Sequence, residues 1–267
     1  MIIVYLDSLS KEVAETCVIL IGELMSMGVL SIDPATFVNH VMVHLDTVED
    51  NNLAIFGLSP NANMNLLLKL LNSLRAFSLK PEIILINRDI YERSKNARVP
   101  GTDLMHNVAI LDETNHFKMV YSALMKCVQY VRSKTKPSRR LDLFIEDVMS
   151  LERTKDLIDT SASLFNEIRS ILNSNNPLVV TPSTRLFAKL LEMERGRDVI
   201  EYYEISKINK EVSRMLDVLT VTSEEHWVKE IAIFANRFVS LNVDPLVAPL
   251  YLIRLYLYLE HVDGSSE

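Results

Sequence analysis

The first residues that could do chemistry are Ser8 and Lys11, which follow a short apolar run at residues 2–6. Their spacing matches S-x-x-K, the nucleophile pattern of penicillin-recognising enzymes. The companion motifs S-D-N and K-T-G do not occur further along the chain. The simpler interpretation is that Asp7, Ser8 and Ser10 offer side-chain oxygens as N-caps at the start of a helix.

Two further pairs have a spacing seen among metal ligands. His40 and His44 stand four residues apart, which places two imidazoles on one helix face, and Glu113 and His116 form a single E-x-x-H. A di-iron helical bundle needs two such motifs and two more glutamates. We therefore expect no metal and no cofactor, and we interpret the two histidines as surface or interface residues.

The glycine content argues against nucleotide chemistry. Glycine accounts for 6 of 267 residues, roughly 2% against a usual value of about 7%. Loops that cradle phosphates need glycines where the backbone must approach the ligand closely. The sequence contains no P-loop, G-x-G-x-x-G, G-x-S-x-G or H-E-x-x-H motif. These absences predict a protein without enzymatic activity and without catalytic residues.

Charge is distributed unevenly along this acidic chain, whose net charge is −7. Residues 1–68 hold one lysine and eight acids, and residues 141–267 hold thirteen basic and twenty-one acidic residues. Residues 69–140 hold fourteen basic residues and six acids. An acidic protein with a basic central region is the clearest functional signal in the sequence.

We expect the basic central region to contact a polyanion, either an anionic lipid surface or nucleic acid, because arginine and lysine suit phosphate groups. Two alternatives are a solvated segment that pairs with the acidic C-terminal half, in the same chain or a neighbour, and a nuclear-import signal at 132–140. The predicted polyanion-binding residues are Arg88, Arg93, Lys95, Arg98, Arg132, Lys134, Lys136, Arg139 and Arg140.

Hydrophobic periodicity predicts a mainly α protein with two helical domains and room for a few short strands in the N-terminal half. The domains are 1–132 and 141–267, joined by a basic linker at 133–140 that has no apolar residue. The alternative for the first 112 residues is a small parallel sheet, because short apolar runs cannot be told from helix by periodicity. The strand candidates are 2–6, 53–57, 82–86 and 107–111. No internal repeat is visible.

The last predicted helix, 245–262, is apolar on all sides, so it must be covered on all sides. It is either the centre of a helical domain or a face that another subunit covers. The predicted interface residues are Tyr251, Leu252, Leu255, Tyr256 and Leu259. Cys17 and Cys127 lie on apolar helix faces, which predicts buried thiols in a reducing compartment. We find no signal peptide and no run of transmembrane length, so we expect an intracellular protein, in the cytoplasm or the nucleus.

These features favour a non-enzymatic assembly protein that self-associates and contacts a polyanion. Helical viral matrix proteins and nucleoproteins are examples of this class, by analogy only. One alternative is a helical adaptor or regulatory subunit that binds another protein. The other is an enzyme with an unrecognised α/β site in residues 1–112.

Overall fold

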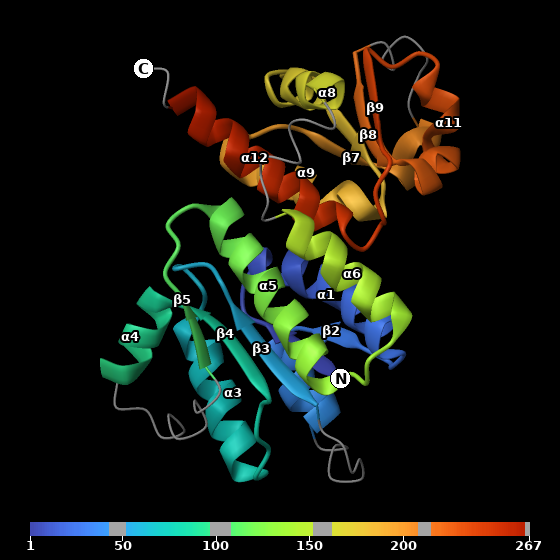
Figure 1. Cartoon of the computed structure of the whole chain (residues 1–267). Helices are drawn as coiled ribbons and strands as arrows, with labels where there is room; N and C mark the ends of the chain where they lie inside the picture. Colours follow the sequence, from blue (N-terminus) through green and yellow to red (C-terminus); the bar gives the residue numbers. More distant parts are fainter. Residues whose placement is uncertain (43–51, 97–107, 152–161, 208–214, 265–267) are drawn as a thin grey trace. The chain divides into compact units, whose positions relative to one another are not determined.

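The computed structural model describes residues 1–42, 52–96, 108–151, 162–207 and 215–264 (Figure 1). The chain forms two compact units, Met1–Lys136 and Pro137–Glu267. Each unit is built on a parallel β-sheet. The fold is therefore α/β, and the prediction of a mainly α protein is wrong.

The first unit contains a five-stranded sheet whose strands all run parallel, in the order β2-β1-β3-β4-β5. The strands are β1 (Ile2–Tyr5), β2 (Leu30–Ile32), β3 (Leu53–Gly57), β4 (Ile83–Asn87) and β5 (Val108–Leu111). Four of them coincide with the apolar runs that the sequence offered as alternative strands. Such continuous apolar runs are typical of parallel strands, because both faces of the sheet are covered.

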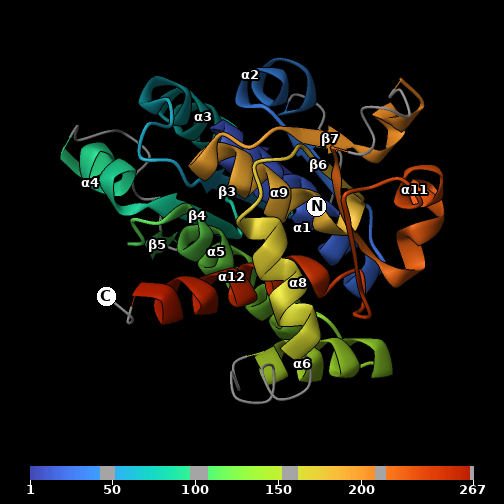
Figure 2. The same ribbon diagram turned by 90° about the horizontal axis from the view of Figure 1, so that it is seen from above.

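Helices cover both faces of this sheet (Figure 2). The first-unit helices are α1 (Ser8–Met25), α2 (Pro34–Thr36), the π-helical turn η1 (Phe37–Val41), α3 (Met64–Ala76), α4 (Arg88–Asn96) and α5 (His116–Lys134). α1 and α5 pack against each other on one face, whereas η1 and α3 contribute side chains to the core on the other face.

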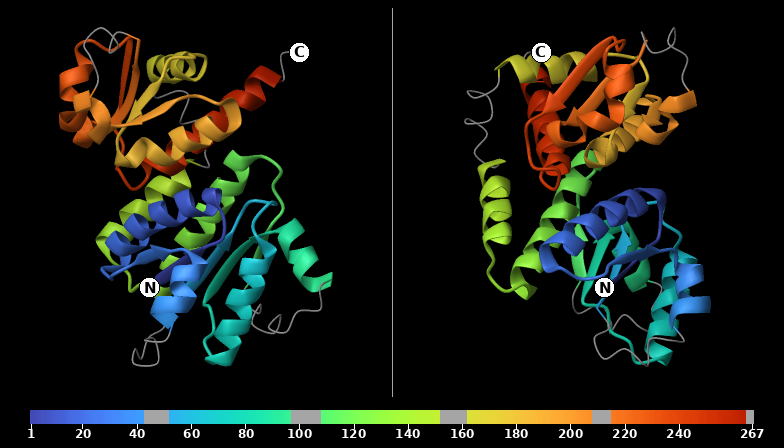
Figure 3. Two further views of the ribbon diagram at one scale, coloured as in Figure 1. Left: turned by 180° about the vertical axis from the view of Figure 1, so that it is seen from behind. Right: turned by 90° about the vertical axis from the view of Figure 1, so that its right-hand side faces the viewer.

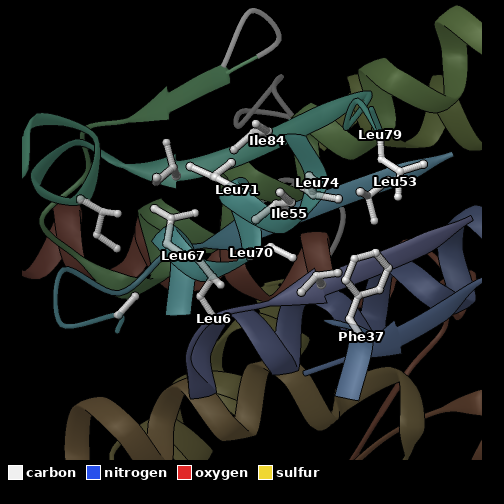
Figure 4. Close-up of a cluster of buried hydrophobic side chains, with 14 of the residues drawn as sticks. Leu6, Phe37, Leu53, Ile55, Leu67, Leu70, Leu71, Leu74, Leu79 and Ile84 are labelled. Atoms are coloured by element: carbon white, nitrogen blue, oxygen red, sulfur yellow. The ribbon is translucent and has the colours of Figure 1, made fainter. Parts of the chain in front are cut away.

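The core beneath α3 is shown in Figure 4. α3 presents a stripe of leucines at helical spacing to Ile55 of β3 and Ile84 of β4, and all of these side chains are fully buried. The leucines are Leu67, Leu70, Leu71 and Leu74. This packing fixes the height of α3 on the sheet, and with it the position of the loop that joins β3 to α3.

The second unit also contains a parallel sheet, with the strand order β7-β6-β8-β9. Its strands are β6 (Leu178–Val180), β7 (Val199–Glu201), β8 (Asp217–Val221) and β9 (Arg237–Leu241). The sequence analysis assigned residues 141–267 to a helical domain, and these four strands show that the assignment is wrong. β6 and β8 are rich in β-branched residues, which suit a buried parallel strand, and local periodicity did not distinguish these strands from helix.

Helices again lie on both faces of the sheet (Figure 3). The second-unit helices are α6 (Arg139–Leu151), α8 (Ala162–Leu172), α9 (Pro182–Arg195), α11 (Glu225–Ala232) and α12 (Ala248–Gly264), with short 3-10 helices η4 (Tyr202–Lys207) and η5 (Thr222–Glu224). Val228 and Ile231 of α11 pack with Val179 and Val218 on one face. α9, α12 and α8 cover the other face.

The two units repeat one topology. The order β2-β1-β3-β4 in the first sheet corresponds to β7-β6-β8-β9 in the second, and every strand is parallel. The sequence shows no repeat because the fold needs only the alternation of buried strands and amphipathic helices, which many side-chain combinations satisfy. The internal repeat is therefore one of topology, which the sequence does not show.

α12 begins at Ala248, one residue before Pro249, rather than at residue 245. It packs against α9 and α6 within the second unit, and the rings of Phe187 and Tyr256 meet edge to face at 6.3 Å. The five predicted interface residues (Tyr251, Leu252, Leu255, Tyr256 and Leu259) are all buried in the chain. The first role predicted for this helix, the centre of a helical domain, is wrong, because α12 belongs to a helical layer that covers one face of a β-sheet. Contact with another copy stays a prediction.

The connection between the two units is shorter than the predicted linker at 133–140. α5 continues through Lys134 and α6 begins at Arg139, so residues 135–138 connect the two helices. Within the described part of the chain, every helix falls short of the length and apolarity that crossing a bilayer requires.

Candidate functional site

Each sheet has a topological switch point, where the chain leaves neighbouring strands in opposite directions. In open α/β sheets, ligands bind outside the carboxyl ends of the strands at such a point. In the first unit the switch point lies between β1 and β3, and in the second between β6 and β8. The residues after these strands are therefore the first candidates for a ligand-binding site.

Asp7 occupies the switch point of the first unit. Its Oδ1 accepts a hydrogen bond from the Ser10 amide at 2.8 Å, which confirms the predicted N-cap of α1. Its Oδ2 accepts from the Ser10 hydroxyl at 2.6 Å and from the amides of Leu58 and Ser59 at 3.1 and 3.3 Å. Burial raises the pKa of Asp7, and the hydrogen bonds from Ser10, Ser59 and Leu58 oppose that rise. The Leu58 amide also donates to the Ser10 hydroxyl oxygen at 2.8 Å. Asp7 and Ser10 thus occupy the backbone amides that could otherwise bind a ligand anion.

The serine–lysine pair does not form a nucleophilic centre. Ser8 is exposed, and the Lys11 amine lies 3.8 Å from a carboxylate oxygen of Glu15. His40 is exposed in η1, and His44 lies outside the described residues. Among the residues that the structure describes, no group of three or more His, Cys, Asp or Glu side chains could hold a metal ion.

Glu224 plays the same part at the switch point of the second unit. Its Oε1 accepts from the Ser183 hydroxyl at 2.7 Å, and its Oε2 accepts from the Ser183 amide at 3.3 Å, in the first turn of α9. Both residues are buried. The hydroxyls of Thr181 and Thr220 lie 3.2 Å apart beside them. In both units, therefore, a carboxylate already bridges the two loops of the switch point, that of Asp7 partly buried and that of Glu224 buried.

A pocket of about 240 Å³ lies beside the first switch point, at the carboxyl ends of β3, β4 and β5. Asn87, the last residue of β4, is buried, and its Oδ1 accepts from the Asp89 amide at 2.8 Å, which fixes the first turn of α4. The lining residues are Leu58, Pro60, Asn87, Arg88, Asp89, Leu111, Asp112, Glu113, Thr114, His116 and Met119. Loops after three neighbouring parallel strands therefore converge on one concave surface.

Arg88 supplies the positive charge of this pocket. Its Nε lies 2.6 Å from Oδ1 of Asp112, and both side chains are more than half exposed. A guanidinium carries five N–H donors, so one ion pair through Nε leaves donors for an anionic ligand. Glu113 accepts weakly from the Ser122 hydroxyl at 3.4 Å. Glu113 and His116 add groups that can accept or transfer protons.

Among the described residues of the second unit, pockets of about 420 Å³ lie at the opposite edge of its sheet, and two of them share Arg195. Arg195 donates to the carbonyl oxygen of Leu172 at 2.9 Å and to the Tyr256 hydroxyl at 3.2 Å. It also lies 5.3 Å from the centre of the Tyr256 ring. These contacts hold α9, α8 and α12 together, so the guanidinium has a structural role there.

The structure brings only part of the predicted basic region to the pocket. Arg88 lines it, and Arg93 donates to the carbonyl oxygens of Pro60 and Ala62 at 3.3 and 3.4 Å, which supports its wall. Lys95 is exposed on α4, and Arg98 lies outside the described residues.

The second basic stretch lies elsewhere. Arg132, Lys134, Lys136, Arg139 and Arg140 are all exposed. Lys134 pairs with Glu82 at 3.1 Å, and Arg140 pairs with Asp244 at 2.5 Å. The second pair joins the basic stretch to the acidic C-terminal half, as one of the alternatives from the sequence expected. Binding of a polyanion by these residues stays a prediction.

Sequence reasoning named Glu113 and His116 only as an isolated metal-ligand motif, and it missed Asn87, Asp112 and Glu224. A signal for Asn87 and Asp112 existed. The apolar runs 82–86 and 107–111 were strand candidates, and residues that follow parallel strands gather at one edge of a sheet. No sequence signal pointed to Glu224, because the strands around it were predicted as helix.

No family model matches the chain, and no curated protein matches its sequence. Solved structures match its fold. Glucosamine-6-phosphate deaminase from Thermotoga maritima is 12% identical, with a TM-score of 0.57 over 98% of this chain and 85% of its own. Tagatose-6-phosphate ketose/aldose isomerase from Escherichia coli is 13% identical, with a TM-score of 0.54 over 98% and 83%. The C-terminal domain of glucosamine-fructose-6-phosphate aminotransferase from Francisella tularensis is 12% identical, with a TM-score of 0.55 over 98% and 83%.

The chain thus shares its α/β fold with sugar-phosphate enzymes. This finding overturns the prediction of a non-enzymatic, matrix-like or nucleoprotein-like assembly protein. Scarce glycine and missing phosphate-loop motifs did not exclude an enzyme fold. The carboxyl edge of a parallel sheet gathers polar loop residues whatever motif precedes them. At 10–13% identity, the likeness concerns the fold alone.

Proposed function

We propose that this protein binds a phosphorylated sugar in the pocket at the carboxyl edge of the first sheet. The observation that carries the proposal is the convergence of Asn87, Arg88, Asp112, Glu113 and His116, from loops after two neighbouring parallel strands and the start of α5, on one pocket. The shared fold with proteins named for tagatose-6-phosphate and glucosamine-6-phosphate supports the same ligand class.

Each part of such a ligand has a counterpart in the pocket. A phosphate group suits the Arg88 guanidinium, which can donate two parallel hydrogen bonds to it. Sugar hydroxyls suit Asp89 and Glu113, because carboxylates accept hydrogen bonds from several donors. The phosphate does not bind the backbone amides of Leu58 and Ser59 at the switch point, because these amides already donate hydrogen bonds to Asp7. The ligand therefore lies beside the switch point, with its phosphate near the start of α4.

The test is calorimetric titration of the full chain with tagatose 6-phosphate and glucosamine 6-phosphate. Unphosphorylated sugars and inorganic phosphate serve as controls. Losing a charge-assisted hydrogen bond costs about 1.5–3 kcal/mol, so Arg88→Gln should weaken binding about 10- to 100-fold. Asp112→Asn should tighten it several-fold, because it removes the carboxylate that competes with phosphate for Arg88.

Arg75→Gln is the matched control. Arg75 is exposed at the far end of α3, and its substitution removes one positive charge, as Arg88→Gln does. The affinity of this variant for the sugar phosphate should therefore equal that of the wild type. Absence of binding by every sugar phosphate, or equal weakening by Arg75→Gln and Arg88→Gln, contradicts the proposed pocket.

A second candidate function is aldose–ketose isomerisation of that ligand, favoured by Glu113 and His116 in the same pocket. Isomerisation needs a base to take the proton next to the carbonyl and an acid to protonate the carbonyl oxygen. An isomerase should exchange that carbon-bound proton with D₂O, as measured by NMR. Glu113→Gln should abolish exchange while keeping binding, and a wild type that binds without exchange is a binding protein only.

A further inference from the structure

The core of the first unit contains a pair of thiols on neighbouring helices. Cys17 of α1 and Cys127 of α5 stand 110 residues apart in the sequence, yet their sulfur atoms lie 3.2 Å apart. Both residues are buried and unbridged. α1 and α5 lie side by side on one face of the sheet (Figure 2). The two side chains therefore point at each other.

We infer that Cys17 and Cys127 are a reversible redox pair that forms an intramolecular disulfide when the protein meets a disulfide oxidant such as oxidised glutathione. The sulfur atoms need to approach by roughly 1.2 Å to reach the length of an S–S bond. Rotation of the two cysteine side chains must supply this approach. This inference is independent of the sugar-phosphate pocket.

The reaction proceeds by thiol–disulfide exchange. One cysteine thiolate attacks a sulfur of glutathione disulfide and releases one glutathione thiol. The other cysteine then attacks the mixed disulfide, forms the Cys17–Cys127 bond and releases the second glutathione. The protein loses two electrons and two protons, and glutathione disulfide gains them. The hydrogen bond to Cys127 and burial raise the pKa of the Cys17 thiol, so exchange should be slow.

The bond would connect two helices whose amino ends carry functional groups. α1 follows Asp7, which bridges the switch point, and α5 begins with His116, which lines the pocket. A cross-link between them also closes a loop of 110 residues. Closing such a loop restricts the unfolded chain, so the oxidised protein should melt on the order of 10 °C higher than the reduced protein.

The experiment equilibrates the full chain in glutathione buffers of graded redox potential from two starting points, the reduced protein and protein refolded with oxidised glutathione. Intact mass under non-reducing conditions and alkylation of free thiols after unfolding measure the oxidised fraction. We expect both starting points to reach the same fraction, as a monomer that has lost two hydrogen atoms. The melting temperature should rise with that fraction.

Cys17→Ser and Cys127→Ser are the controls, because each keeps one thiol and cannot form the internal bond. Neither should show the two-hydrogen loss or the rise in melting temperature. Two alkylatable thiols at every potential from both starting points would overturn the inference. So would glutathione adducts or disulfide-linked dimers as the main oxidised species.

Discussion

The buried carboxylate of Asp217 accepts hydrogen bonds from residues at the amino ends of the strands of the second sheet. Removing its charge tests how much this buried network contributes to the stability of the second unit. Asp217 at the start of β8 is fully buried and accepts from Arg197 at 2.8 Å, Asn236 at 3.1 Å, Arg237 at 3.3 Å and Asn176 at 3.4 Å. These partners precede or begin β7, β9 and β6. Asp217→Asn keeps the shape of the side chain and removes its charge.

The expected cost follows from the burial of the pair. Arg197 is buried, so Asp217→Asn removes a counterion from a charge in a region of low dielectric. Removing one partner of a buried ion pair costs about 3–5 kcal/mol. We expect about 3 kcal/mol, because Arg197 still donates to the carbonyl oxygens of Ile171 and Asn176 at 2.6 and 2.8 Å.

The assay is urea unfolding followed by fluorescence of Trp227, the only tryptophan in the sequence, which lies in α11 of the same unit. With a slope of about 2 kcal/mol per molar urea, the midpoint should fall by about 1.5 M. Arg140→Met is the control. Its ion pair with Asp244 is shorter, at 2.5 Å, but the arginine side chain is 54% exposed, so the cost should stay below about 1 kcal/mol. Equal midpoint shifts for the two variants would refute the reasoning from burial.

Three further predictions concern the first unit. Burial raises the pKa of Asp7, so the folded protein binds the Asp7 proton more tightly than the unfolded chain does. The wild type should therefore gain stability relative to Asp7→Asn as the pH falls from 7 toward about 3.9. Parallel pH profiles of the two urea midpoints would contradict this. Leu70→Ala, in the fully buried stripe of α3, should cost about 2–5 kcal/mol in urea unfolding, whereas a cost below 1 kcal/mol would argue against this core. A Cβ at Gly57 would lie 3.0 Å from Cδ1 of Leu6, so Gly57→Ala should lower the free energy of unfolding by about 1–3 kcal/mol. The double variant Gly57→Ala/Leu6→Ala should lose less stability than the sum of the losses in the two single variants.

The sequence predicted much of the first unit, at least as an alternative. Residues 2–6, 53–57, 82–86 and 107–111 are continuous apolar runs, and the structure makes each of them a strand. The choice of a mainly α fold failed because periodicity alone does not separate a buried strand from a short buried helix. Strand pairing that joins residues 2 and 53 is a tertiary fact that no local window contains.

In the second unit the same limitation had larger effects. Phe238 continues the helical spacing of Trp227, Ile231 and Phe234, yet it belongs to β9, because pairing with β8 overrides the local pattern. β6 is only three residues long and lies between Pro177 and Pro182, which look like helix-stop signals in the sequence.

The site was harder still to predict. Asp7 meets the amides of Leu58 and Ser59 across about fifty residues, and Glu224 meets Ser183 across 41 residues. These contacts depend on the register of parallel strands and on the length of each crossover. The capping role of Asp7 was predictable because it is local, whereas its bridging role was not.

The most direct test of the sugar-phosphate pocket is amide hydrogen exchange of the full chain with and without glucosamine 6-phosphate, read by mass spectrometry. Residues 87–89 and the segment 111–119 contain most of the pocket lining, so bound ligand should slow their exchange, and unphosphorylated glucosamine at the same concentration should not. Slowed exchange confined to residues 181–184 of the second switch point, or no change in any segment, would contradict the account.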